Sequence, residues 1–387
     1  MTIDIKGWGT APSKEAVTDQ TKTAPLGLYV HIPFCVRKCA YCDFCSQPPT
    51  GDITDRYFAR LARELGGYKR EPKIPVDTLF IGGGTPSVLP DGYTARLYKM
   101  LADTFDLSPL AEFTVEVNPG TLTLAMALEY KSIGVNRISL GLQSIHENEL
   151  KKLGRIHTFE EAREAVSLIR SVGIDNVSLD LMYGIPEQTV ASFDRTLDAV
   201  IDLAPSHISV YGLIIEEGTP FATDENLALP NEDTECDMYD LACEKLSRAG
   251  YRHYEISNYA KEGCECRHNL KYWHAEEYIG IGAAAHSFFN GVRFGNSRDL
   301  LEILRDGTYE DDGDRAYEYV MMHLRLIDGF SLSDFKSRFG YDFYDAYDEL
   351  IGQYLEMGLM RLDGDRLSLT ERGFYVSNTL LVSFLDE

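Results

Sequence analysis

A regular alternation of strand-like and helix-like segments is the feature that most constrains the fold of this chain. From about residue 27 to residue 258, short β-branched and apolar runs alternate with amphipathic segments of helical period. The predicted strands are 28–32, 76–81, 113–117, 137–142, 177–183 and 207–213, and the predicted helices are 53–66, 91–105, 122–133, 158–172, 190–203 and 231–249. Six such units predict parallel strands with right-handed crossovers, in either an open doubly wound sheet or a barrel. A seventh strand is expected at 253–257.

Polar residues recur at or just after the ends of several predicted strands. They are His31, the glycines of "GGGTP" (82–86), Glu116, Asn118, Gln143, Asp180 and Tyr211. In both candidate architectures the functional site lies at the carboxyl ends of the strands. Because so many polar residues occupy equivalent positions, we expect a barrel-like sheet with a polar interior at one mouth.

The pattern changes from about residue 311, where the "DDGDR" segment (311–315) interrupts it. Helices are predicted at 315–327, 331–338, 343–357 and 371–384, with a hairpin turning at Asp363-Gly364. Helices combined with a hairpin wing predict a winged-helix-like module. The sequence therefore predicts three parts, which are a polar tail (1–26), a barrel with an extension (27–300) and a C-terminal domain (311–387).

Composition and charge indicate where in the cell the protein acts and which class of partner is excluded. The 387-residue chain is 44% hydrophobic, its first 25 residues do not have the pattern of a signal peptide, and no uncharged apolar run reaches the ~18 residues of a membrane span. We therefore expect a cytoplasmic protein, in whose reducing surroundings clustered cysteines favour metal or redox chemistry over disulfides. The net charge of −24, with 16 acidic and 7 basic residues in 311–387, argues against nucleic acid as a partner.

Four of the eight cysteines lie in one short segment, "FCVRKCAYCDFCSQ" (34–47). Thiolates favour iron–sulfur clusters, zinc or copper(I). A zinc site would pair this segment with Cys264, Cys266 and His268. A ferredoxin-type cluster would use all four cysteines, but the bacterial ferredoxin spacing differs. The third interpretation is C-x3-C-x2-C with an extra cysteine, which would leave one iron of a four-iron cluster open to a chelating ligand.

The segment "YVHIPFCVRKCAYCDF" resembles the radical S-adenosylmethionine superfamily, in the branch of the oxygen-independent coproporphyrinogen dehydrogenases. The resemblance extends from Leu28 to the C-terminal module and includes "IGGGTPS", "EVNPGTL", "GVNRISLGLQS", "LGRIH", "LDLMYGIPEQT" and "EGTPF". Within this branch, "CRHNLKYW" (266–273) is similar to the H-N-x-x-Y-W signature of the heme chaperones called HemW. The resemblance implies an α/β fold with a partial (β/α)6-type, TIM-like radical SAM barrel and a C-terminal helical, winged-helix-like domain.

The resemblance also implies a set of cofactor-binding residues. Cys35, Cys39 and Cys42 would bind a 4Fe-4S cluster, whose open iron would hold S-adenosyl-L-methionine (SAM), while Cys45 would lie beside the cluster without binding it. The residues expected to line the SAM region are Tyr29, Tyr41, Gly83, Gly84, Thr85, Glu116, Gln143, Arg155, Asp180 and Ile214. Carboxylates such as Glu116 and Asp180 suit ribose hydroxyls or an amino group, and Arg155 suits a carboxylate. Glycines at 83 and 84 would let the backbone approach the cofactor.

Heme is the third group that the resemblance implies. Its motif would consist of His268, Asn269, Tyr272 and Trp273, in which the flat apolar indole suits a porphyrin and imidazole is a usual iron ligand. By residue type alone, the same residues could equally form a packed corner. Cys264, Cys266 and His286 are further ligand candidates whose roles the sequence leaves open.

Two functions remain in competition. A heme chaperone would bind heme and pass it to respiratory proteins, with a homodimer and transient membrane association through the partner left open. A coproporphyrinogen III dehydrogenase, or another radical SAM enzyme acting on a tetrapyrrole, would do chemistry on the porphyrin. The resemblance favours the chaperone, because the dehydrogenases' fourth cysteine would fall at position 44, where this chain has Phe44, and because only 27 residues precede Leu28.

Overall fold

A computed structural model describes residues 25–303, 305–309 and 315–384, without the side chains of 305–309. The predicted polar tail therefore lies outside the described residues, apart from its last two positions. The boundaries of the predicted three-part division remain predictions.

Six parallel strands in chain order form the centre of the protein. They are β1 (Leu26–Ile32), β2 (Val76–Gly83), β3 (Glu112–Val117), β4 (Arg137–Gln143), β5 (Asn176–Tyr183) and β6 (His207–Gly212), and each pairs with the next. A doubly wound sheet would reverse its strand order, so this continuous order confirms the predicted partial barrel. All six strands lie within a few residues of their predicted positions.

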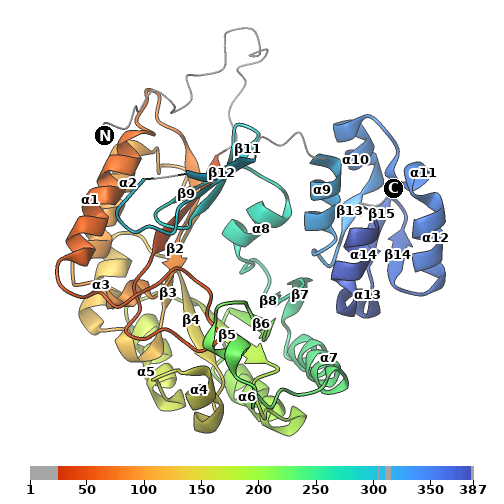
Figure 1. The fold of residues 1–387 in the computed structure, drawn as a ribbon, viewed down its shortest axis with the longest axis horizontal. Coiled ribbons are helices and arrows are strands. Elements are labelled where there is room, and N and C mark those ends of the chain that lie inside the picture. Colours follow the sequence, from red (N-terminus) through yellow and green to blue (C-terminus); the bar gives the residue numbers. More distant parts are fainter. Residues whose placement is uncertain (1–24, 304, 310–314, 385–387) are drawn as a thin grey trace.

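The crossover helices cover the outer face of this sheet (Figure 1). They are α1 (Ile53–Gly66), α2 (Tyr93–Thr104), α3 (Leu124–Ser132), α5 (Phe159–Ser171), α6 (Val190–Asp202) and α7 (Glu232–Arg248), as predicted, and the short α4 (Glu147–Leu153), which the sequence did not predict. Capping boxes start α5 at Thr158 and α6 at Thr189. Alternate strand residues such as Val115 and Leu140 pack under the helices in the main core, which leaves the other face for polar side chains.

Strands after β6 extend the sheet at both of its edges. The predicted seventh strand is β7 (Arg252–Glu255), but it forms an antiparallel hairpin with β8 (Asn258–Ala260), which pairs antiparallel with β6. The seventh parallel strand is instead β9 (Tyr278–Ile281), which returns to pair with β1. An antiparallel extension follows, made of β10 (His286–Phe289), β11 (Val292–Asn296) and β12 (Arg305–Tyr309).

The C-terminal domain has its own core and lies across α8 (Arg267–Trp273) from the barrel (Figure 1). It contains α9 (Arg315–His323), α10 (Leu332–Phe339), α11 (Phe343–Ala346), α12 (Asp348–Glu356), α13 (Glu371–Tyr375) and α14 (Ser377–Ser383). A small sheet of β13 (Phe330–Ser331), β14 (Met360–Asp363) and β15 (Arg366–Leu369) carries the predicted hairpin wing. Two predicted long helices are each broken in two, at Tyr347 and at Val376. In the described part of the chain, no helix is both long and apolar enough to cross a membrane.

Candidate functional site

The cysteine segment forms a loop between β1 and α1, at the carboxyl end of the strands. The Cys35 amide donates to Gln47 O (3.1 Å), and the Thr85 amide donates to Phe34 O (2.7 Å). The Thr85 hydroxyl also donates to Cys35 Sγ (3.4 Å). The turn after β2 therefore fixes the start of the loop, and with it the first cysteine.

Beneath this loop lies a pocket of about 330 Å³, here called the cluster pocket. Ten of the residues predicted from the sequence line it, namely Cys35, Cys39, Tyr41, Cys42, Gly83, Gly84, Glu116, Gln143, Arg155 and Asp180. They come from the cysteine loop, from the carboxyl ends of β2, β3, β4 and β5, and, for Arg155, from the segment that follows α4. Five of them, Gly83, Gly84, Glu116, Gln143 and Asp180, were also expected to lie together because of their positions at strand ends, although they are up to 97 positions apart in the chain.

Two carboxyl groups lie on the floor of the cluster pocket. Glu116 accepts a hydrogen bond from the Gly83 amide (2.9 Å), while Asp180 accepts from the hydroxyls of Ser139 (3.0 and 3.1 Å) and Ser178 (3.3 Å). Burial raises the pKa of Glu116 to about 7, and burial also raises the pKa of Asp180. Both groups therefore gain from a ligand that donates hydrogen bonds or carries positive charge.

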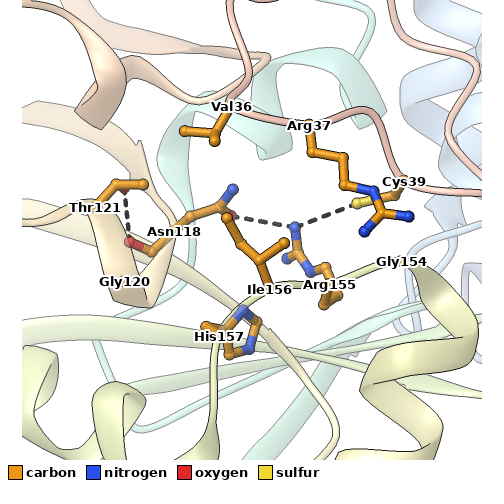
Figure 2. Close-up of a pocket in the computed structure, with 10 residues that line it drawn as sticks. All are labelled: Val36, Arg37, Cys39, Asn118, Gly120, Thr121, Gly154, Arg155, Ile156 and His157. Atoms are coloured by element: carbon orange, nitrogen blue, oxygen red, sulfur yellow. Dashed lines mark hydrogen bonds between the residues drawn. The ribbon is translucent and has the colours of Figure 1, made fainter.

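Arg155 closes one side of the cluster pocket. Its guanidinium donates to Asn118 Oδ1 (3.2 Å), to Gly141 O (2.7 Å) and to Cys39 Sγ (3.8 Å), and Figure 2 shows it between Asn118 and Cys39. Its Nε and the Oε1 of Gln143 are buried without a hydrogen-bond partner among the described residues. Buried polar atoms of this kind usually have a partner, so two of them beside one pocket indicate a missing polar ligand.

Backbone geometry at Gln143 and Gly83 gives a second indication of a specialised site. Gln143 has φ +69°, which is uncommon for a residue with a side chain. A Cβ on Gly83 (φ +103°) would lie 2.2 Å from His31 Nδ1, and one on Gly84 would lie 2.6 Å from Ile32 O and Phe34 O. These glycines are thus required for packing against β1 and the cysteine loop, a reason that the sequence did not reveal.

Three predicted residues lie apart from the cluster pocket. Thr85 is buried behind Cys35, where its hydroxyl also accepts from Asn118 Nδ2 (2.9 Å). Tyr29 lies further inside the barrel, with its hydroxyl hydrogen-bonded to His31 Nδ1 (2.9 Å). Ile214, on the loop after β6, is 69% exposed and lines none of the pockets described here.

A smaller cavity of about 190 Å³, here called the interior cavity, continues from the cluster pocket into the barrel. Glu116, Ser139, Asp180 and Tyr211 line both spaces. The far wall is formed by three residues of the predicted heme motif, namely His268, Asn269 and Tyr272. The motif and the cluster pocket thus share one polar interior.

Helix α8 closes the amino-terminal end of the barrel. Glu112, the first residue of β3, accepts hydrogen bonds from the backbone amides of Arg267 (2.9 Å) and His268 (3.0 Å). His268 is buried, its Nδ1 is hydrogen-bonded to the Thr78 hydroxyl (2.9 Å) and its Nε2 to the Tyr272 hydroxyl (2.7 Å). Burial lowers its pKa to about 3. Both ring nitrogens of His268 are therefore already occupied.

Trp273 faces away from the interior cavity. The Arg325 guanidinium, from the C-terminal domain, lies 6.0 Å from the centre of the indole ring. The nearby Glu255 is buried, and burial raises its pKa to about 7. The structure thus separates Trp273 from the other three motif residues and places it between the two domains.

The remaining cysteines do not join a common metal site. Cys266 is buried, with its Sγ 3.6 Å from Glu112 Oε1, while Cys264 is half-buried. Within the described residues, no three His, Cys, Asp or Glu side chains form a group that could hold a single metal ion. Nothing in this part of the chain supports the zinc alternative.

Sequence reasoning missed several residues of the barrel interior. Arg137, Ser139 and Ser209 line the interior cavity. Burial alone would lower the pKa of Arg137, but the neighbouring Cys266, Glu112 and Asp180 raise it overall. The missed signal was the alternation of Arg137 with Ser139 and of His207 with Ser209 and Tyr211, which places each set on one face of its strand.

Comparisons with known proteins agree with this arrangement. Residues 29–200 match the family model "Radical SAM superfamily", and residues 311–376 match "HemN C-terminal domain". The chain is 35% identical to a protein of Lactococcus lactis named "Heme chaperone HemW", over 93% of this chain and 97% of the relative. It is 36% identical to the protein of the same name from Escherichia coli, over 95% and 100%. The solved structure of coproporphyrinogen III oxidase (HemN) from E. coli, described as a radical SAM enzyme, has the same fold, with a TM-score of 0.80, 23% identity and coverage of 93% and 90%.

Proposed function

The chain belongs to the HemW family of heme chaperones, within the radical SAM superfamily, and from this premise we propose that it binds heme and delivers it to respiratory proteins. In this proposal it also carries a 4Fe-4S cluster and SAM. The observation that carries the proposal is the cluster pocket, where three cysteines of one loop meet two buried polar atoms that have no partner in the described part of the chain.

Cys35, Cys39 and Cys42 would hold the cluster, and Cys45 would not. A cluster bound by three thiolates would leave one iron open to SAM and would supply the electron for its chemistry. Arg155 Nε and Gln143 Oε1 suit the carboxylate and amino groups of SAM, while Glu116 and Asp180 suit the ribose hydroxyls. Tyr29, Tyr41, Thr85 and Ile214 remain proposed members of this region, and Gly83 and Gly84 shape its backbone.

The motif of His268, Asn269, Tyr272 and Trp273 is proposed to contribute to heme binding. Three of these residues face the interior cavity, and the fourth lies where a recipient protein could disturb the contact between the two domains. Motion of the C-terminal domain would thus be coupled to the heme motif.

The setting of this function is proposed as well. The chain would act in the cytoplasm, reach the membrane only through its recipient, and use a homodimer if two copies are needed for transfer. Its net charge of −24 fits a protein partner better than nucleic acid. We keep the division into 1–26, 27–300 and 311–387 as the proposed domain organisation.

Hemin titration of the anaerobically reconstituted protein tests the proposal. We expect a saturable Soret band with one hemin per chain, and no conversion of coproporphyrinogen under reducing conditions with SAM present. The absence of saturable hemin binding would overturn the chaperone function, and turnover of coproporphyrinogen would replace it with an enzymatic one.

A further inference from the structure

A third pocket lies outside the barrel interior, between β1, the end of the cysteine loop and the β9–β11 extension. This outer pocket measures about 490 Å³, within the ~300–1,000 Å³ usual for small-molecule and cofactor sites. Aromatic side chains form much of its wall, namely those of Tyr29, Phe44, Tyr272 and Tyr278. Such a wall suits a large flat apolar ligand.

The outer pocket contains several side chains of the types that bind heme iron, which are histidine, cysteine and tyrosine. Most of them are already engaged. His31 Nδ1 is hydrogen-bonded to the Tyr29 hydroxyl (2.9 Å) and its Nε2 to Cys45 O (2.8 Å). The Tyr272 hydroxyl is hydrogen-bonded to His268, and that of Tyr278 to Arg293. Cys45 Sγ donates to Arg298 O (3.3 Å).

His286 differs from all of these groups. It is the one exposed histidine among the nine in the chain, all of which are described, and its imidazole has no hydrogen-bond partner in the described part of the structure. It begins β10, and Gly295, directly across on β11, has no side chain to cover it. A free imidazole thus faces an aromatic pocket.

The polar and apolar groups at the rim complete a site for an amphipathic ring. Phe44 is 62% exposed, so its ring can cover an apolar ligand. The Arg298 guanidinium, bonded to the Asp43 carboxylate (3.3 Å), is also exposed and offers donors to an anionic substituent. Apolar walls with one cation at the rim match a heme whose propionates point outward.

We propose that the outer pocket is the heme site and that His286 is the protein ligand of its iron. This inference rests on the proposed chaperone function and assigns the heme that the chaperone carries to the outer pocket. His268 is then a positioning residue, because it orients Tyr272, which lines both the interior cavity and the outer pocket. A ligand on an exposed strand end also suits a cargo that has to leave.

Hemin titration of His286→Ala, followed by the Soret band and by low-temperature electron paramagnetic resonance, tests this assignment. We expect at least tenfold weaker binding and loss of the imidazole-ligated signal, and added free imidazole is expected to restore that signal. His274→Ala is the matched control, because the His274 imidazole also has no hydrogen-bond partner among the described residues but lies outside the three pockets. It is expected to bind hemin as the unmodified chain does.

A second variant tests the assignment through the heme spectrum, independently of the affinity for hemin. His286→Cys places a thiolate at the same position, so a thiolate-ligated spectrum is the expected result and an imidazole-ligated one overturns the assignment. Unchanged binding and spectrum in His286→Ala, or loss of the ligand signal in Cys45→Ser, also overturn it. Failure of the unmodified chain to bind hemin would overturn the chaperone function itself, and with it this site.

Discussion

The interior cavity and the outer pocket share Tyr29 and Tyr272, but only the outer pocket also contains, among the described residues, a histidine whose ring has no hydrogen-bond partner. In the interior cavity, His268 is buried and both ring nitrogens have partners within the fold. In the outer pocket, His286 is exposed and its ring has none among the described residues. A satisfied buried histidine stabilises its surroundings, whereas an unpartnered one is available to a ligand.

Under our proposal, the HNLKYW motif and the iron ligand lie in different parts of the molecule. Helix α8 carries the motif but closes the amino-terminal end of the barrel, the end that usually contributes stability. The cysteine loop and His31 lie at the other end. We infer that the motif shapes the heme pocket through Tyr272 and leaves iron ligation to a residue that the motif does not contain.

Serine substitutions in the cysteine loop test the largest expected difference between the cluster pocket and the outer pocket, which is the presence of a cluster ligand. Cys42 lines the cluster pocket, whereas Cys45 lines the outer pocket. We expect Cys42→Ser to lose at least nine-tenths of the cluster iron and sulfide, because a thiolate ligand is removed, and Cys45→Ser to keep both. Iron and sulfide analysis after anaerobic reconstitution measures this. The reverse pattern would make Cys45 the third ligand.

His268→Ala probes the interior cavity. Removing this buried ring leaves the Thr78 and Tyr272 hydroxyls without their partner and opens a cavity, so we expect a loss of about 2–4 kcal/mol in the free energy of unfolding. Hemin affinity should fall only a few-fold, with an imidazole still bound to iron. Urea unfolding and the heme spectrum are the measurements, and His268→Gln should restore part of the stability. A variant of normal stability that lacks the imidazole signal would make His268 the ligand.

The pH dependence of stability probes Glu116, whose pKa of about 7 lies above the ~4.3 of an unfolded chain. Because the folded state binds this proton more tightly, the contribution of Glu116 to the free energy of unfolding is greatest at low pH and is lost as the pH rises through about 7. Glu116→Gln cannot ionise, so its stability relative to the unmodified chain should rise by about 1–3 kcal/mol between pH 5 and pH 8.

Urea unfolding at the two pH values gives this difference. Glu255→Gln is the matched control, because Glu255 has a similar pKa but lies at the contact with the C-terminal domain. The stability of Glu255→Gln relative to the unmodified chain should also change with pH, while its binding of SAM should stay unchanged. A Glu116→Gln difference that does not vary with pH would mean that Glu116 is ionised in the folded protein.

The six parallel strands could be predicted because each is an apolar run with its own helix. Of the ten predicted residues in the cluster pocket, Gly83, Gly84, Glu116, Gln143 and Asp180 followed from their positions at strand ends, whereas the three cysteines, Tyr41 and Arg155 followed from the family resemblance. The β9–β11 extension could not be predicted from the sequence. The segment "YIGIGAAAHSFF" has no clear alternation of polar and apolar residues, and nothing local indicates that β9 returns to pair with β1. For the same reason the role of His286 stayed open. The position of His268 depends on where Glu112 docks α8, a contact 156 residues apart in the chain.

Retention of SAM in the presence of hemin tests the central claim most directly, namely that heme and SAM occupy separate pockets. Equilibrium dialysis of labelled SAM against the reconstituted protein, with and without saturating hemin, measures it. Because heme would lie in the outer pocket and SAM in the cluster pocket, we predict that SAM occupancy is unchanged and that its Kd shifts less than about threefold. Competitive displacement, with the Kd for SAM rising in proportion to the hemin concentration, would place heme inside the barrel and contradict this account.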